Sequence, residues 1–344
     1  MDLWAARAAA NGLGRARATS VVDAVSEVVA LQGQDLRANR LAVRARTDGL
    51  TWQDVDAAIG RREVVRTWAM RGTLHMLAAA DLRWVLRELG GYFRDRQAPR
   101  RRQLGLDDAT CERGVTQLEH VLTAPLTRAE IKERLDLPLD GQAAPYLLAF
   151  AALEGVVCRG PERGGEPTYV LTKDWVTSDR DGQLALRYLR GYGPASPRAL
   201  AAWSGLPLTT ARQAFLDVRD LLEPFGAAEC FVLKGHEPGE AVEARLLGHF
   251  DAFLLGYGER SIPPGHTRKV QSGGGFVMPV VSVGGRVLST WRQRSSRDSL
   301  TIEVTPFTTI SAQLISELSA EVADLGRFLD QRASLSVVGI ATSD

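Results

Sequence analysis

The stretch of the sequence best suited to chemistry is Leu31-Gln32-Gly33-Gln34-Asp35, where two carboxamides lie two positions apart. In an extended or turn segment, residues i and i+2 point the same way, whereas in a helix they diverge. Gly33 favours the non-helical conformation, so Gln32 and Gln34 could face one cavity. An amide is no base near neutral pH, but its fixed dipole can orient a water molecule. The alternative is a polar turn whose amides cap helix ends.

Other arrangements of catalytic residues are missing from the sequence. There is no P-loop, no G-x-G-x-x-G after a strand, no H-E-x-x-H and no nucleophile elbow. The five histidines are scattered without ligand spacing, so we expect no metal site and no cofactor. The run Gly273–Gly275 could cradle a phosphate, but such runs are more often the tips of loops.

The elements around the glutamine segment predict a winged helix-turn-helix. Three helical patterns and a strand–turn–strand pattern follow one another, over 20–31, 36–46, 51–59 and 64–77. Thr51 and Asp54 have the spacing of a weak capping pair, and Arg71-Gly72 marks the turn of the hairpin. The glutamine segment then lies between the first two helices.

The same order of elements returns twice along the chain. The second set covers 109–122, 127–135, 142–154, 156–159 and 168–172, and the third covers 181–192, 197–204, 209–218 and 230–234. The fold class expected is therefore α+β, with three tandem winged helices. We place the domains at 1–105 (with the glutamine segment and a linker helix), 106–178 and 179–344.

The C-terminal part of the third domain is expected to be rich in β-structure. Strands over 276–283 and 286–292 flank the two-residue turn Gly284-Gly285, which is typical of a hairpin. A further strand over 300–305 precedes a last amphipathic helix over 311–332. The tail from Ser334 to Asp344 is expected to be poorly ordered.

Charge is distributed unevenly along the chain. The sequence has 42 basic and 41 acidic residues, yet residues 31–103 hold 15 arginines and only eight acidic residues. Only four of the basic residues are lysines, a bias that a GC-rich genome would produce, although guanidinium groups also bind phosphates bidentately. The basic first third favours a polyanionic partner such as DNA.

Composition also bounds where the protein acts. No apolar run reaches 18 residues, so we expect no membrane span, and the N-terminus has no secretory pattern. Cys111, Cys158 and Cys230 lie far apart and are odd in number, which favours a reducing cytoplasm over a disulfide framework. With no strong dimerisation helix evident, we expect a monomer in the cytoplasm, associated with the nucleoid.

The chain resembles a known family, the winged-helix DNA glycosylases of the AlkZ type and their relative YcaQ. Four stretches carry the resemblance: Leu31–Arg46, Arg66–Met76, Phe250–Tyr257 and Gly285–Arg292. Their order and spacing also agree, so that the resemblance covers essentially residues 3–332. The AlkZ type has Gln, an aliphatic residue and Gln, whereas the YcaQ type has Asp at the third place. Gln32 and Gln34 put this chain on the AlkZ side, while Gly33 departs from the pattern and could loosen both amides.

The resemblance implies an enzyme that excises N7-alkylated guanine from double-stranded DNA held in a basic channel curved along the three winged helices. It also implies unhooking of interstrand crosslinks, in repair or in self-resistance to DNA-alkylating natural products. Alkylation at N7 makes the base cationic and activates the glycosidic bond. Gln32 and Gln34 would then orient the attacking water and stabilise an oxocarbenium-like sugar. Asp35 would be structural, and without a nearby lysine no Schiff-base lyase step is expected.

The expected DNA contacts come from four arginines and one histidine of the first domain and from one arginine of a C-terminal hairpin. They are Arg37, Arg40, Arg66, Arg71, His75 and Arg286. Arg286 would lie at the tip of a hairpin that enters a groove, unless this is an ordinary structural hairpin. Arg66, Arg71 and His75 would touch phosphates from the first wing, the alternatives being surface charge or a buried, hydrogen-bonded histidine. The competing function is a non-catalytic DNA-binding protein or transcriptional regulator.

Overall fold

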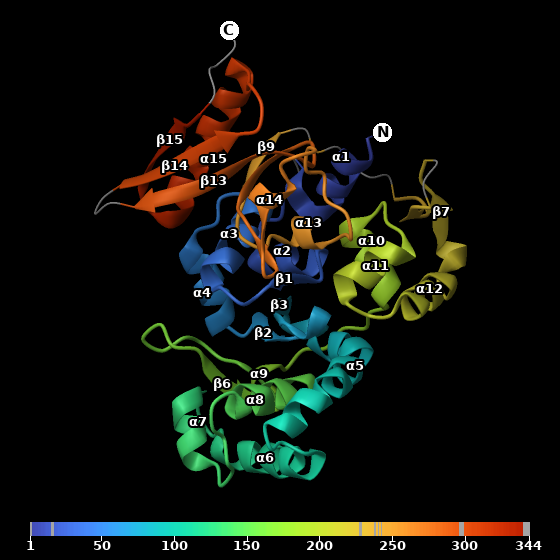
Figure 1. The fold of residues 1–344 in the computed structure, drawn as a ribbon, viewed down its shortest axis with the longest axis vertical. Helices are drawn as coiled ribbons and strands as arrows, with labels where there is room; N and C mark the ends of the chain where they lie inside the picture. Colours follow the sequence, from blue (N-terminus) through green and yellow to red (C-terminus); the bar gives the residue numbers. More distant parts are fainter. Residues whose placement is uncertain are drawn as a thin grey trace.

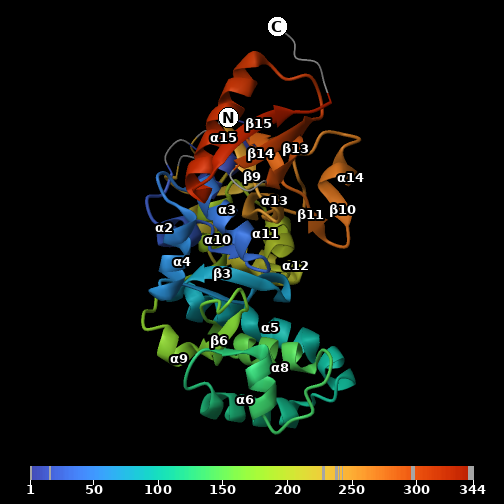
Figure 2. The ribbon, with the colours of Figure 1, turned by 90° about the vertical axis from the view of Figure 1, so that its left-hand side faces the viewer.

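The computed structural model describes residues 2–14, 17–226, 229–236, 239, 241, 243–295 and 299–339. The molecule is elongated, with the second part of the chain at one end and the C-terminal sheet at the other (Figure 1). Between these ends the N-terminal and third parts lie beside each other, and the side view shows the N-terminal part in front of the third (Figure 2). Helices and strands both occur in every part, so the fold class is α+β as expected. Within the described ranges, no helix is long and apolar enough to cross a membrane.

The N-terminal part contains three helices and a hairpin in the expected order, but the helix expected over 20–31 ends at Glu27, and Ala30 and Leu31 lie in a strand. Its elements are α1 (Leu3–Ala8), the π-helical turn η1 (Ala9–Leu13), α2 (Val21–Glu27), β1 (Ala30–Gln32), α3 (Leu36–Arg46), α4 (Trp52–Gly60), β2 (Val64–Trp68), η2 (Met70–Gly72) and β3 (Leu74–Ala78). Ser20 caps α2, and Thr51 with Asp54 forms a capping box at the start of α4. The hairpin turns at Arg71 and Gly72, which both have positive φ.

A long helix leads into the second part. Its elements are η3 (Ala79–Asp81), α5 (Leu82–Gln103), α6 (Asp108–Val121), β4 (Leu126–Thr127), α7 (Arg128–Arg134), α8 (Ala143–Leu153), β5 (Val157–Arg159), β6 (Thr168–Leu171) and α9 (Thr172–Trp175). One six-stranded sheet, in the order β1-β3-β2-β5-β6-β4, joins this part to the first. The two predicted domains therefore share a sheet through the pairing of Arg66 with Arg159.

The third part repeats the order of helices and hairpin on a smaller scale. It comprises α10 (Leu184–Tyr192), α11 (Pro197–Ser204), α12 (Leu208–Leu216), η4 (Arg219–Leu221), β7 (Leu222–Pro224) and β8 (Phe231–Leu233). The rings of Tyr188, Tyr192 and Trp203 lie within 5.4 Å of one another, measured between centroids, and form the centre of this part. Because all three are buried, α10 and α11 are fixed against each other.

The C-terminal part is a sheet covered by the last helix. Its elements are β9 (Ala244–Leu247), α13 (Ala252–Leu255), α14 (Thr267–Val270), β10 (Gln271–Gly273), β11 (Phe276–Val277), β12 (Val280–Val283), β13 (Arg286–Ser295), β14 (Ser299–Pro306), α15 (Ala312–Leu329) and β15 (Arg332–Val337). The sheet order is β15-β14-β13-β12-β9. The single strand expected over 276–283 is split, because β11 pairs with β10 in a hairpin of its own.

The prediction of a poorly ordered tail is wrong for residues 334–337. β15 pairs in parallel with β14 along its whole length. Ala333, Leu335 and Val337 alternate along β15 and pack on the buried cluster between the sheet and α15. Residues 340–344 lie outside the described residues.

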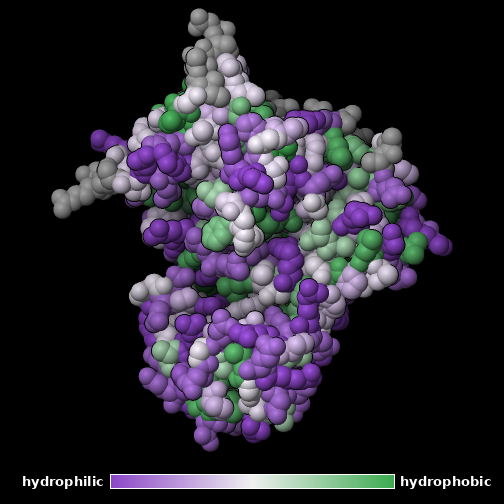
Figure 3. All heavy atoms as spheres, viewed as in Figure 1, coloured by the Kyte–Doolittle hydropathy of each residue, from purple (hydrophilic) through white to green (hydrophobic). Residues whose placement is uncertain are grey.

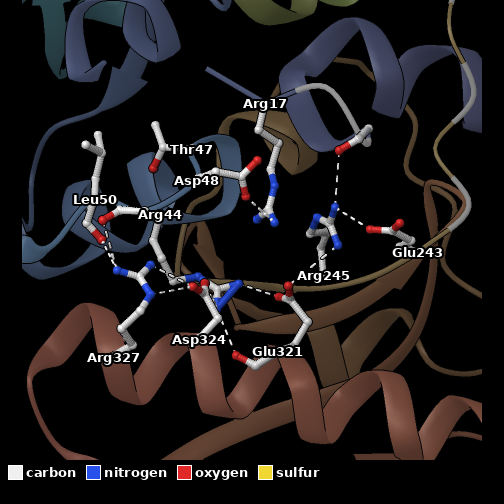
Figure 4. A network of polar contacts seen from close by, with 12 residues as sticks. Arg17, Arg44, Thr47, Asp48, Leu50, Glu243, Arg245, Glu321, Asp324 and Arg327 are labelled. Carbon is white, nitrogen blue, oxygen red and sulfur yellow. Dashed lines mark hydrogen bonds and ion pairs between the residues drawn. The ribbon is translucent and has the colours of Figure 1, made fainter. Parts of the chain in front are cut away.

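A buried ion network ties the N-terminal part to α15 (Figure 4). Arg44 of α3 donates to the Glu321 carboxylate and, at 3.1 Å, to its backbone oxygen. The second Glu321 carboxylate oxygen lies 3.6 Å from Arg245 of β9. Because Arg44, Arg245 and Glu321 are all buried, the network holds the helix that follows the glutamine segment in one position.

Candidate active site around Gln32 and Gln34

The glutamine segment is extended at its start, as the sequence predicts. β1 pairs antiparallel with β3, so that Gln32 lies opposite His75. The N–H of Gly33 continues the ladder by donating to the Leu74 carbonyl at 2.7 Å. The chain then turns within two residues into α3, whose N-cap is Asp35. The two glutamines therefore lie at the junction of a strand and a helix.

Gly33 is required by the backbone and does not loosen the segment. A Cβ atom at this position would lie 2.9 Å from both the Cα and the carbonyl carbon of His75, a distance that real Cβ atoms do not tolerate. The Gly33 carbonyl also accepts a hydrogen bond from Arg66 at 2.9 Å. Glycine thus lets β1 lie directly on β3, and both of its backbone polar groups are held.

The side chain of Gln32 is fixed on both sides of its amide. Arg71 donates to its Oε1 at 2.8 Å, and its Nε2 donates to the Thr73 hydroxyl at 3.2 Å. Its backbone oxygen accepts a hydrogen bond from the buried Asn39 of α3. These partners define which end of the amide is oxygen and leave one lone pair and one N–H for other contacts.

His75 serves as a neutral acceptor behind Gln32. Its Nδ1 lies 2.9 Å from the Thr73 carbonyl, so this nitrogen carries the proton, and Nε2 accepts from Arg71 at 3.1 Å. Burial lowers the pKa of His75 to about 3, and the charge of Arg71 adds to this effect. The alternative of a buried, hydrogen-bonded histidine is therefore the one observed, and His75 is unsuited to proton transfer at neutral pH.

Gln34 differs from Gln32 in being exposed. Its side chain forms no hydrogen bond with another described residue, so both ends of its amide face solvent. The neighbouring Asp35 caps α3, accepting a hydrogen bond from the Arg37 backbone at 2.8 Å. This confirms the structural role expected of Asp35 and leaves Gln34 as the unengaged polar group of the segment.

The structure places the expected DNA contacts of the first domain in three different settings. Arg66 is only 5% exposed and bridges the Gly33 carbonyl and Glu162, so in this conformation it positions the glutamine segment and does not face a phosphate. Arg40 is engaged with Asp56 at 2.6 Å and lies over the Trp52 ring. Arg37 is exposed and makes no side-chain hydrogen bond or ion pair with the described residues.

The hairpin expected to enter a groove is covered at its turn. Gly285 lies so close to the Trp4 carbonyl oxygen that a Cβ would be 2.1 Å away. Arg286 is exposed but paired with Asp2 at 2.7 Å. The turn thus packs on α1, and this geometry agrees with the alternative of an ordinary structural hairpin.

A different hairpin has an open tip. β10 and β11 are joined through Gly274 and Gly275, neither of which has an atom within 4 Å of its potential Cβ. Phe276 follows this turn and is 55% exposed, with its ring 5.3 Å from that of Phe250. The run Gly273–Gly275 is thus a loop tip, and the aromatic residue directly after it was the signal that sequence analysis missed.

Sequence analysis also missed the residues that fix α3, the helix that follows the glutamine segment. Arg46, at the end of α3, donates to Asp251 at 2.8 and 3.0 Å, and both side chains are fully buried. Asp251 is the N-cap of α13, so this ion pair locks α3 to the C-terminal part. The two residues are 205 positions apart, and no local pattern links them.

Metal or thiol chemistry finds no support in the described part of the chain. No group of three or more His, Cys, Asp or Glu side chains there could hold a metal ion. The three cysteines are buried and unpaired. Burial raises the pKa of Cys158 to about 12, so this thiol is no nucleophile.

Comparison with known proteins gives consistent matches along almost the whole chain. The family model described as DNA glycosylase AlkZ-like matches residues 25–328. A Streptomyces sahachiroi protein named interstrand DNA cross-link repair glycosylase is 27% identical over 341 residues, which covers 90% of each chain. Among solved structures, the DNA glycosylase AlkZ of the same organism has a TM-score of 0.82 and 25% identity and covers 98% of both chains.

Proposed function

The chain belongs to the AlkZ-like family of DNA glycosylases and is therefore a DNA glycosylase, and we propose that it hydrolyses the N-glycosidic bond of N7-alkylated, cationic purines. The observation that carries this proposal is the composition of the site: two amides, Gln32 and Gln34, and an adjacent carboxylate, that of Asp35, which caps α3. An amide cannot deprotonate water, so such a site suits a leaving group that is already activated. A purine made cationic by alkylation is such a group.

The two glutamines have different parts in the proposed reaction. Gln34, exposed and unengaged, accepts a hydrogen of the attacking water and aims its oxygen at C1′ of the sugar. Gln32, fixed by Arg71 and Thr73, directs its remaining lone pair at the same water or at the positive charge that develops on the sugar. Orientation and preorganised dipoles of this kind contribute much of the rate in enzymes.

The enzyme is proposed to be monofunctional and independent of metal. A lyase step needs an amine nucleophile near the sugar, and the first lysine of the chain is Lys132, which lies on α7 and is paired with Asp140. Asp35 is committed to capping α3. Hydrolysis by an oriented water is the step that these side chains support.

DNA is proposed to bind along three winged helices that correspond to residues 1–105, 106–178 and 179–344. The recurring order of three helices and a hairpin supports this reading, as does the positive excess of residues 31–103. The space-filling view shows an indentation between the upper and lower parts of the molecule, which the six-stranded sheet joins (Figure 3). Phe276 on the open β10–β11 hairpin is a suitable wedge for a groove.

Bulky lesions, including interstrand crosslinks, are proposed as substrates. The Streptomyces sahachiroi relative is named for crosslink repair, and the exposed position of Gln34 at a strand–helix junction suits a lesion too large for a closed pocket. The protein is proposed to act as a monomer in the cytoplasm, on the nucleoid, in repair or in self-resistance to DNA-alkylating natural products.

The test is excision from defined duplexes. A duplex with one 7-methylguanine and a duplex with a bulky N7 crosslink are incubated with the protein in parallel, and hot alkali then cleaves any abasic site. Strand cleavage at the lesion in both duplexes supports the proposal. Binding without cleavage of the methylated duplex would contradict the proposed chemistry.

A further inference from the structure

Arg71 is a partly buried cation whose partners are all neutral. Its guanidinium donates to Gln32 Oε1, to His75 Nε2 and to the Trp203 carbonyl of α11. Among the described residues, no carboxylate is paired with it. The buried Arg46, by contrast, faces a carboxylate, as the cost of burying a charge requires. Burial lowers the pKa of Arg71, and the positive charge of Arg260 lowers it further.

Arg260 is the second such cation. It is partly buried, its Nε donates to the Leu254 carbonyl at 2.6 Å, and the described part of the chain offers it no carboxylate either. The loop that carries Arg260 packs on α11, because a Cβ at Gly258 would lie 3.4 Å from that of Ala202. Arg71 reaches the next residue of the same helix, Trp203. The guanidinium of Arg71 and the loop that carries Arg260 therefore contact neighbouring residues of α11 from different parts of the chain.

The backbone of Arg71 is also held in an unfavourable conformation. Its φ is 56°, in the left-handed region that residues other than glycine rarely adopt. The following Gly72 takes the same sign of φ without this cost. The turn thus accepts strain at the position whose side chain contacts Gln32, a pattern that is common where function determines the geometry.

Two partly desolvated positive charges that repel each other are stabilised by an anion between them. Three N–H groups of Arg71 are engaged in the contacts above, so the donors on Nε and the second N–H of Nη1 remain for charge-assisted hydrogen bonds to a phosphate. The DNA strand that brings a damaged base to Gln32 necessarily brings its own phosphodiester groups to the same place. We propose that Arg71 and Arg260 form a subsite for the phosphodiester next to the damaged nucleotide. This inference rests on the proposed glycosylase function.

The subsite gives Arg71 two linked tasks. One edge of its guanidinium fixes the Gln32 amide, while the phosphate neutralises its charge. An anionic phosphate there also lies near the sugar on which positive charge develops. Correct seating of the strand is thereby coupled to the orientation of Gln32.

The test combines a protein variant with a neutral backbone. Single-turnover excision of 7-methylguanine is measured for wild type and Arg260→Gln, on duplexes in which the 5′ or the 3′ phosphate of the lesion is replaced by a methylphosphonate. Arg260→Gln should slow excision by about 10- to 100-fold, as for loss of a charge-assisted hydrogen bond. One of the two methylphosphonates should slow wild type similarly and slow the variant much less, because both changes remove one contact.

The matched control is Arg219→Gln, which alters an exposed arginine of the same part of the chain, paired at 3.6 Å with Asp220. It should excise at the wild-type rate and respond to both methylphosphonates as wild type does. If the effects of Arg260→Gln and of each methylphosphonate simply multiply, the subsite is wrong, while excision by wild type from the unmodified duplex leaves the proposed function standing. If wild type fails on the unmodified duplex, the proposed function fails, and the subsite with it.

Discussion

The guanidinium of Arg71 donates a hydrogen bond of 2.8 Å to the side-chain oxygen of Gln32, across 39 positions of sequence. This contact decides which end of the Gln32 amide is presented to a substrate. Arg71, expected to touch phosphates from the surface of the wing, is partly buried and positions the amide of Gln32. The site is therefore one held amide and one free amide, not two equivalent ones.

Arg71→Lys should slow excision by about tenfold, since one hydrogen bond to a charged group is lost. A lysine keeps the charge, but its single nitrogen cannot occupy both positions from which Nη1 of Arg71 reaches Trp203 and Nη2 reaches Gln32 and His75. In a Gln32→Ala background the same substitution should cost much less, because the amide it positions is gone. Single-turnover rates of wild type, the two single variants and the double variant measure this coupling. Independent effects of the two substitutions would show that Arg71 does not act through Gln32.

Gly33→Ala should destabilise the protein by about 1–3 kcal/mol, the usual range for overpacking, and should lower the excision rate. The new Cβ would lie 2.9 Å from the His75 backbone and push β1 away from β3. Urea unfolding measures the first effect. Gly91→Ala on the exposed face of α5, where nothing lies within 4 Å, is the control and should stabilise by about 0.5–1 kcal/mol. Equal behaviour of the two variants would contradict the tight packing.

His75 should make the protein less stable in acid. Its pKa is about 3 when folded and about 6.5 when unfolded, so between these values the unfolded chain binds the extra proton. The contribution of the neutral His75 to the free energy of unfolding is complete above about pH 6.5 and is lost as the pH falls toward 3. The free energy of unfolding, measured with denaturant between pH 6 and 4, should fall less steeply with pH in His75→Gln than in wild type. The difference in slope should be about 1.4 kcal/mol per pH unit. Parallel slopes would mean that His75 is protonated in the folded protein.

Asp251→Asn should cost about 3–5 kcal/mol of unfolding free energy, because it leaves Arg46 buried without its counter-charge. The control is Glu63→Gln, which breaks the exposed pair with Arg61 and should cost less than about 1 kcal/mol. Thermal and urea unfolding of both variants separate the two cases. A small effect at Asp251 would show that the ion pair with Arg46 is not what holds α3 to the C-terminal part.

Local features of this chain were predictable from its sequence. The bounds of α3 and α11 agree with the expected ones, and the capping box at Thr51 lies where its spacing predicts. Each of these features depends on residues within a few positions of one another. The turn at Arg71 and the extended start of the glutamine segment follow from glycine in the same way.

Features that depend on distant residues were not predictable. β15 forms because it pairs with the edge of β14. The alternating pattern of residues 332–337 is short, and it does not show by itself that such a partner strand exists. The covered turn at Gly285 depends on α1, more than 270 positions away. The burial of Arg66 and His75 was not predictable for the same reason: a cationic or polar residue in a hairpin is expected to be exposed unless its buried partners are known.

Variants of the two glutamines separate their roles. Gln32→Ala should slow excision at saturating enzyme while DNA affinity stays near wild type, and the double variant with Gln34→Ala should lose less than the product of the single effects. Gln34→Asp should keep much of the activity on 7-methylguanine, because a carboxylate can hold or deprotonate the same water. If the rate of the double variant falls by the full product of the two single effects, the two amides act on different groups.

The most direct test of the central claim compares Gln34→Ala with Asp35→Asn in single-turnover excision of 7-methylguanine, with DNA affinity measured alongside. Removing one preorganised dipole costs about 100- to 1,000-fold in rate, so Gln34→Ala should fall by that factor while its affinity for DNA is unchanged. Asp35→Asn should excise at close to the wild-type rate, because Asn also caps a helix. Loss of excision in Asp35→Asn with Gln34→Ala near wild type would mean that a carboxylate is the base and that the glutamine mechanism is wrong.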